Sequence, residues 1–261
     1  MTAYLAILSA RFRLLLQYRA AALAGLATQV FWGLIRMMIF IAFYENAAAQ
    51  PMDLAQTVSY VWLGQAFLLL MMLGRDSEIS QMIRTGSVVY ELVKPLDLYG
   101  IWFSRMLAHR VAPTLLRSMP ILVVATLAGW LHWSSWPAVL AFAASLAGAA
   151  VLSAALGVLL NISMFWTVSG TGLVRMTDAA AYLLGGTMMP LVLFPDAWQT
   201  VLNLLPFRGL GDAPFRIFAG NIPPAGLAGV LLHQLIWAAV LVLAGRLLLR
   251  RAIRRLNVQG G

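Results

Sequence analysis

The chain has 261 residues, of which 62% are hydrophobic and only 10% are charged. A soluble globule of this size needs more polar surface, so the composition indicates an integral membrane protein and excludes a soluble domain. The formal net charge of +9 does not indicate nucleic-acid binding, because the arginines lie mainly at the termini and beside the hydrophobic runs, and the lack of cysteine excludes disulfides and thiolate metal sites.

The first predicted element is an amphipathic helix over residues 4–19, with apolar side chains on one face and Arg11 and Arg19 elsewhere. This pattern is typical of a helix that lies at the membrane interface. Six apolar segments follow, each near the length that crosses a hydrocarbon core of roughly 30 Å. We therefore expect one all-α membrane domain with six transmembrane helices, at 22–44, 58–74, 111–131, 137–160, 176–195 and 224–249.

The basic residues predict the orientation of these spans. Three precede the first span, five lie between Arg75 and Arg110, and four lie between Arg250 and Arg255, whereas the connections 45–57 and 132–136 contain no lysine or arginine. Short loops rich in lysine and arginine stay in the cytoplasm. Both termini and the loop at 75–97 are thus expected to be cytoplasmic, although two arginines in the 196–223 connection fall on the outer side.

The loop at 75–97 is unusually polar for this chain, because residues 74–97 hold seven of the 27 charged side chains. Its first part predicts a short helix with one apolar face, acidic residues at its start and an arginine near its end. Such a helix can insert into a groove on a partner or rest on the lipid surface. The residues that carry this prediction are Asp76, Glu78, Ile79, Met82, Ile83, Arg84 and Gly86.

The last outer connection, 196–223, is too apolar for a solvated loop. Trp198, Val201, Leu202 and Leu205 recur at helical spacing, and four prolines interrupt the segment. Irregular backbone at membrane depth must be buried in protein or line a wet cavity. We therefore expect short re-entrant helices in the outer leaflet.

Polar residues at membrane depth are costly and often functional. Arg36 lies about 12 Å from the outer end of the first span at the helical rise, where it can face the translocation path or a second subunit, or else snorkel outward or form a structural pair. Asp178 lies three residues after Arg175, a spacing that permits an ion pair. Three further residues complete the predicted substrate path: Trp62, Gln65 and Tyr182. Gln65 can hydrogen-bond between helices, and the two aromatic rings can line a path for a planar or cationic substrate or pack between helices.

The sequence lacks the motifs of an enzyme. A phosphate-binding loop of the form GxxxxGK[ST] needs a lysine followed by serine or threonine, and the only lysine, Lys94, is followed by Pro95. No HExxH, GxSxG or paired-carboxylate motif is present, so we expect neither a metal site nor catalysis. Any ATP hydrolysis that drives transport must come from another polypeptide.

The chain resembles the type 2 ATP-binding-cassette permeases, the drug and polysaccharide exporter class, over nearly its whole length. The resemblance rests on the amphipathic helix before the first span, the stretch IRTGSVVYELVKPLD after the second, the six spans, and the proline-broken segment before the last. The pattern from Gly86 to Pro95 is similar to that of a bacterial subgroup of uncharacterised permeases.

This resemblance implies that two six-span permeases, identical or related, pair in the bacterial cytoplasmic membrane above two ATPase subunits that bind ATP and Mg. The helix at 76–84 would be the coupling element in a cleft of the ATPase. The expected cargo is an amphipathic or hydrophobic small molecule that moves outward. A lipid or glycan cargo stays open as an alternative. A function as an ion channel or a membrane scaffold also stays open, but a channel is disfavoured because no span contains a cluster of charged residues that could form a ring.

Overall fold

The computed structural model describes residues 2–17, 19–46, 50–167 and 170–254, and within these ranges every regular element is a helix. The predicted all-α class is confirmed. Residue 18 of the predicted interfacial helix and Arg255 of the C-terminal basic cluster lie outside the described residues.

Among the described residues, four helices are long and apolar enough to cross a membrane: α2 (Arg19–Asn46), α7 (Leu98–Leu127), α8 (Trp136–Ile162) and α12 (Leu227–Ile253). They contain or overlap the predicted spans 22–44, 111–131, 137–160 and 224–249. Helix α7 begins at Leu98, thirteen residues before the predicted span 111–131, and the Asp97 side chain caps it by accepting a hydrogen bond of 2.9 Å from the Gly100 amide. The point at which this helix enters the membrane stays a prediction. Two prolines inside α7 do not end it, as membrane helices tolerate proline.

The other two predicted spans, 58–74 and 176–195, do not form single long helices. The first contains α3 (Leu54–Ala66) and α4 (Leu68–Met71), which are separated at Phe67. The second contains α9 (Thr171–Leu184), which ends where Gly186 takes a φ of 80°, and the short 3-10 turn η2 (Leu191–Leu193) follows. The helices alone therefore do not confirm a count of six spans.

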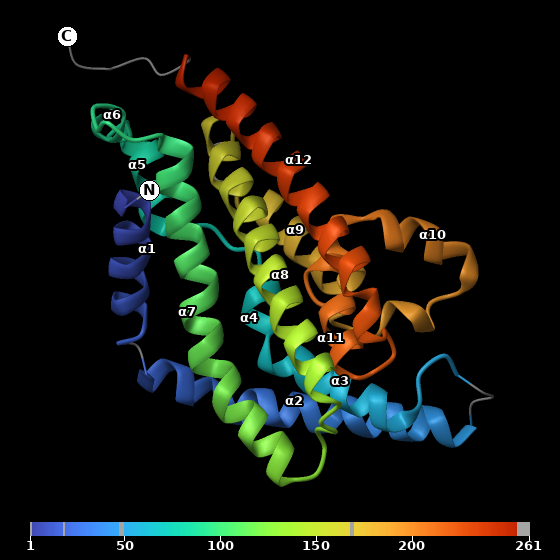
Figure 1. The fold of residues 1–261 in the computed structure, drawn as a ribbon. Helices are drawn as coiled ribbons and strands as arrows, with labels where there is room; N and C mark the ends of the chain where they lie inside the picture. The colour runs from blue at the N-terminus through green and yellow to red at the C-terminus, as the bar shows by residue number, and fades with distance from the viewer. Residues whose placement is uncertain (1, 18, 47–49, 168–169, 255–261) are drawn as a thin grey trace.

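Helix α8 lies between α7 and α12 (Figure 1). Its buried face is rich in small residues, including the fully buried Ala149, Ala154 and Ala155, which allow close approach of neighbouring helices. The Gln234 amide on α12 donates to the backbone oxygens of Ser145 at 2.9 Å and of Gly209 at 2.8 Å. This amide therefore joins α12 to α8 and to the segment before α11.

The connection 196–223 forms short helices as predicted: α10 (Asp196–Leu204), η3 (Pro206–Gly209) and α11 (Asp212–Phe218), with η4 (Pro224–Gly226) leading into α12. The Asp212 carboxylate is fully buried and accepts hydrogen bonds from the Leu191 amide at 2.8 Å and the Tyr60 hydroxyl at 3.1 Å. These bonds join α11 to α3 and to the segment after α9. Entry of this connection into the outer leaflet stays a prediction.

The first helix, α1 (Thr2–Leu15), the loop helices α5 (Ser77–Thr85) and α6 (Val89–Leu92), and the last turns of α12 lie at one end of the molecule (Figure 1). We call this the coupling end. Helix α1 runs beside the first half of α7, and the Tyr4 hydroxyl accepts a hydrogen bond of 2.9 Å from the Asp97 amide. Helix α2 instead runs across the far end of α7 in Figure 1. The interfacial position of α1 and the cytoplasmic position of this end stay predictions.

Candidate functional site

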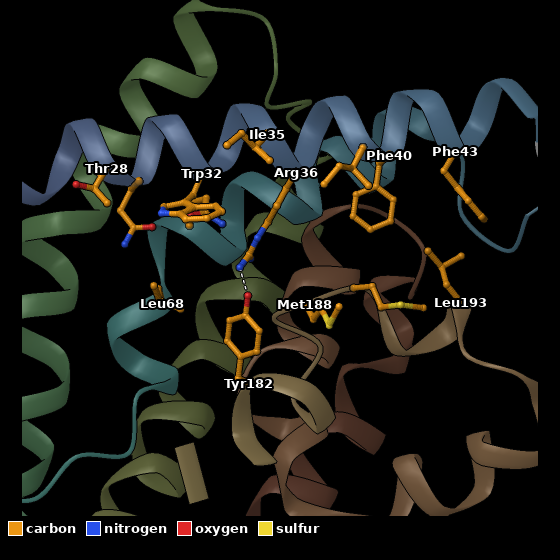
Figure 2. Close-up of a pocket in the computed structure, with 14 residues that line it drawn as sticks. Thr28, Trp32, Ile35, Arg36, Phe40, Phe43, Leu68, Tyr182, Met188 and Leu193 are labelled. Atoms are coloured by element: carbon orange, nitrogen blue, oxygen red, sulfur yellow. Dashed lines mark hydrogen bonds between the residues drawn. The ribbon is translucent and has the colours of Figure 1, made fainter. Parts of the chain in front are cut away.

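A cavity of about 740 Å³ lies between α2, the junction of α3 and α4, and the end of α9 (Figure 2). Eight of its lining residues come from one side of α2, between Thr28 and Phe43, because residues three and four apart share a helix face. Most of the lining is aromatic or aliphatic, with Trp32, Phe40 and Met188 among the larger side chains. The size and the mixture of an apolar wall with a few polar groups are typical of small-molecule sites.

Three of the five predicted path residues meet in this cavity: Arg36, Gln65 and Tyr182. Figure 2 shows the Arg36 side chain pointing from α2 toward Tyr182 on α9. Its guanidinium donates hydrogen bonds to the Tyr182 hydroxyl and, at 2.9 Å, to the Thr187 backbone oxygen, and its central carbon lies 5.4 Å from the centre of the Tyr182 ring. Arg36 thus points into the cavity and does not snorkel outward.

The other two predicted path residues lie elsewhere. Trp62 is fully buried and stacks on Trp130 with 4.7 Å between ring centres, which is a packing role. Asp178 accepts a hydrogen bond of 2.6 Å from the Leu73 amide. The ion pair that the spacing of Arg175 and Asp178 permits does not occur among the ion pairs of the described residues.

Helix α5 agrees closely with the predicted helix at 76–84. Asp76 caps its start by accepting hydrogen bonds from the amides of Glu78 at 2.8 Å and Ile79 at 3.3 Å, and Gly86 ends it with a φ of 73°, which favours glycine. Its apolar face points inward: Ile79 is fully buried, and Met82 and Ile83 pack against the cluster that contains it. The chain's own core therefore occupies the face that we expected to enter a groove on a partner.

The acidic start of α5 is paired with arginines of α1 and α7. Arg105 donates to Asp76 at 3.0 Å and to Glu78 at 2.8 Å, and Arg11 also donates to Glu78. The hydrogen bond from Arg11, assisted by Arg105 and opposed by partial burial, lowers the pKa of the Glu78 carboxyl from 4.5 to about 2. The carboxylate is thus charged at neutral pH, and the cluster joins α1, α5 and α7.

The surface that α5 leaves open is polar and basic. Its outer face and the start of α9 line a second, open cavity of about 620 Å³, to which Arg75, Gln81 and Arg84 contribute. Partial burial, assisted by the nearby charge of Arg84, lowers the pKa of Arg75. Of the predicted coupling residues, Glu78, Arg84 and Gly86 are exposed, and the Glu78 carboxylate is paired with arginines.

Beyond α5, the tip of the coupling end exposes apolar side chains. Tyr90 is 75% exposed and Val93 is 81% exposed, and no residue of α6 is buried. The predicted coupling residues end at Gly86 and do not include this tip. Its sequence signal was available, because the apolar run from Val88 to Val93 lies in a loop that the charge pattern places outside the membrane.

The extended segment between α4 and α5, residues 72–76, connects the coupling end to the cavity. The buried Arg110 of α7 donates to the backbone oxygens of Met72 and Gly74, and Asp178 of α9 holds the Leu73 amide between them. Tyr182 lies one helical turn after Asp178 and lines the cavity. We call this set of contacts the linker clamp. These contacts connect the segment that leads into α5 to both α7 and α9.

No group of three or more histidine, cysteine, aspartate or glutamate side chains that could hold a metal ion occurs within the described part of the chain. The three histidines at 109, 132 and 233 lie on α7, on the connection after it and on α12. The cavity's polar side chains are Arg36, which only donates hydrogen bonds, and two amides and two hydroxyls, which can donate or accept them.

The model of a family described as "ABC-2 family transporter protein" matches residues 54–260. The matched region includes α5, the linker clamp and α9, and leaves out α1 and α2. No curated protein matches the chain.

Proposed function

The chain belongs to the ABC-2 transporter family of membrane proteins, and from that premise we propose that it is the permease subunit of an ATP-driven exporter, powered by a separate ATPase. Its partners are two ATPase subunits, which bind ATP and Mg, and a second permease, identical or related. The sequence supports this division of labour, because it has no phosphate-binding loop. The complex lies in the bacterial cytoplasmic membrane with the coupling end in the cytoplasm.

The observation that carries the proposal is the continuous set of contacts from α5 to the cavity. The ATPase binds the exposed side of the coupling end, formed by Arg84, Gln81 and the apolar tip at Tyr90 and Val93. Movement of α5 reaches the cavity through the linker clamp, since α9 holds both Asp178 and Tyr182. A chain of packed elements with specific contacts, here α5, the linker clamp and α9, can carry a conformational change from one site to another.

The cavity supports an amphipathic or hydrophobic small molecule as the cargo. Its wall is mainly apolar. Helices α2 and α9 form opposite sides of the cavity and are held together there by non-covalent contacts, so they can move apart to admit a ligand. A lipid cargo, the alternative within transport, has the same chemistry. A glycan needs a path lined mainly by hydrogen-bonding groups, whereas nine of the fourteen residues that line this cavity are apolar.

Six membrane crossings are part of the proposal. The four long helices supply four, and the α3–α4 unit and α9 supply the others as shorter, interrupted segments. The exposed apolar faces of α2 and α12, with Phe31, Met38 and Leu243 among their residues, contact lipid or the second permease.

The exposed tip provides a test of ATPase binding. The full chain would carry an affinity tag and be co-expressed with the ATPase encoded beside it. We expect Tyr90→Ser with Val93→Ser to lower the recovered ATPase about tenfold or more, because interface aromatics often contribute over 1 kcal/mol. Trp136→Ser is the matched control, since Trp136 is 79% exposed at the other end of the molecule. Equal ATPase recovery by the wild type, the double variant and the control would refute the proposal that the ATPase binds this tip.

A further inference from the structure

Arg36 is the single charged residue among the described residues that line the cavity. Its two hydrogen-bond partners, the Tyr182 hydroxyl and the Thr187 backbone oxygen, are neutral. An arginine side chain has five N–H donors, so these bonds use two of them. None of the ion pairs among the described residues gives Arg36 a carboxylate. A cation at membrane depth without an anion is costly, which favours an anion that comes from outside the chain.

Gln65 supplies a second, independent observation. It is 2% exposed and lines the same cavity, and within the described ranges its side-chain nitrogen has no hydrogen-bond partner. Buried polar groups without partners are rare and usually meet a ligand or water. The cavity is thus lined by an arginine that has no carboxylate partner and by a glutamine whose buried side-chain nitrogen has no acceptor.

We propose that this cavity binds an amphipathic anion, with its carboxylate or phosphate head on Arg36 and Gln65 and its apolar body against Trp32, Phe40 and Met188. The inference rests on the proposed export function and names the class of cargo. Charge-assisted hydrogen bonds to an anion replace the neutral acceptors of Arg36, and the Gln65 amide gains the acceptor it lacks. A cationic amphipath is repelled at the same place, and a neutral one leaves the arginine charge without an anion.

The test is photolabelling of the purified full chain in nanodiscs of phosphatidylcholine. A twelve-carbon acid with a diazirine in its chain is the probe, and labelled peptides are mapped. Dodecanoate, dodecanol and dodecyltrimethylammonium compete at equal mole fractions in the membrane, so that tail partitioning does not decide the result. We expect label on α2 and α9, and competition by dodecanoate that is roughly tenfold stronger than by the other two.

Variants assign this preference to Arg36. Arg36→Gln, which keeps an amide donor, should weaken competition by dodecanoate roughly tenfold, and Arg36→Lys, which keeps the charge, should retain most of it. Arg175→Gln is the matched control, because Arg175 is an exposed arginine that does not line the cavity. Each variant is used only if it elutes as wild type does in size-exclusion chromatography, and Arg36→Lys decides the result if Arg36→Gln does not fold.

Two sources of the anion are distinguished by the lipid. If phosphatidylglycerol in the nanodisc competes as well as dodecanoate, the bound anion is a lipid head group. The proposal of an amphipathic anion is then supported, and the cargo is an anionic lipid. Equal competition by dodecanol and dodecanoate, or unchanged labelling of Arg36→Gln, overturns the inference. Failure here together with ATP-driven export by the assembled complex rejects only the anionic cargo, whereas anion preference without ATPase association rejects the exporter proposal and leaves an anion site.

Discussion

Replacement of Asp178 by alanine should uncouple ATP hydrolysis from transport. The carboxylate accepts a hydrogen bond of 2.6 Å from the Leu73 amide and also attracts the buried Arg110 guanidinium. Loss of a charge-assisted hydrogen bond that leaves a buried amide without a partner costs about 2 kcal/mol. That cost increases the population of the detached linker about 30-fold, since 1.4 kcal/mol corresponds to a factor of ten.

The assay measures substrate moved per ATP hydrolysed in proteoliposomes that contain the permease and its ATPase. Asp178→Ala should lower this ratio by up to about 30-fold while the ATPase still binds, because the exposed docking tip is unchanged. Asp178→Asn keeps a neutral acceptor and should have an intermediate effect. Asp196→Ala, an exposed acid on α10, is the control. An unchanged ratio in folded Asp178→Ala would refute the linker clamp as the route of coupling.

Three further predictions concern stability, each measured by thermal unfolding in detergent. Gly86→Ala should destabilise the chain by about 1 kcal/mol, because the φ of 73° strains any β-carbon, whereas Gly229→Ala in the open interior of α12 should be neutral or stabilising; equal effects would contradict the capping role. The pKa of Glu78 is lowered in the folded state. The ionised Glu78 side chain therefore stabilises the fold above pH 4.5, and this stabilisation disappears as the pH falls toward about 2. Because its side chain is 54% exposed, Glu78→Gln should cost only about 1 kcal/mol at pH 7, and a difference from wild type that does not shrink below pH 4 would contradict the ion pairs. Trp62→Ala should cost about 3 kcal/mol or more through loss of the buried stack on Trp130, while Trp133→Ala, at a position 55% exposed, should cost much less.

Local signals predicted the coupling helix well. Asp76, the apolar spacing and Gly86 fix its start, its inner face and its end within about one residue, because capping and periodicity act over a single turn. The same signals could not say what covers the apolar face. Ile79 packs on the chain's own core, a long-range contact that the pattern of a nine-residue segment does not contain.

The cavity shows a second limit of sequence reasoning. Polarity at membrane depth identified Arg36 and Gln65, and an aromatic ring identified Tyr182. Their convergence depends on how α2 and α9 are rotated and placed, which no local pattern fixes. Asp178 shows the competition between partners. Its spacing from Arg175 permits an ion pair, yet the buried Leu73 amide binds the carboxylate, because an unpaired buried N–H costs more than an exposed ion pair contributes.

The most direct test of the exporter proposal is ATP-dependent movement in proteoliposomes that contain the purified chain and its ATPase. Three fluorescent twelve-carbon amphipaths, an acid, an alcohol and an amine, serve as probes. The proposal predicts that at least one moves, that movement needs ATP and both subunits, and that Met188→Trp, which fills the cavity, reduces it. Movement of none of them by a complex that hydrolyses ATP, or equal movement without the ATPase, would contradict it.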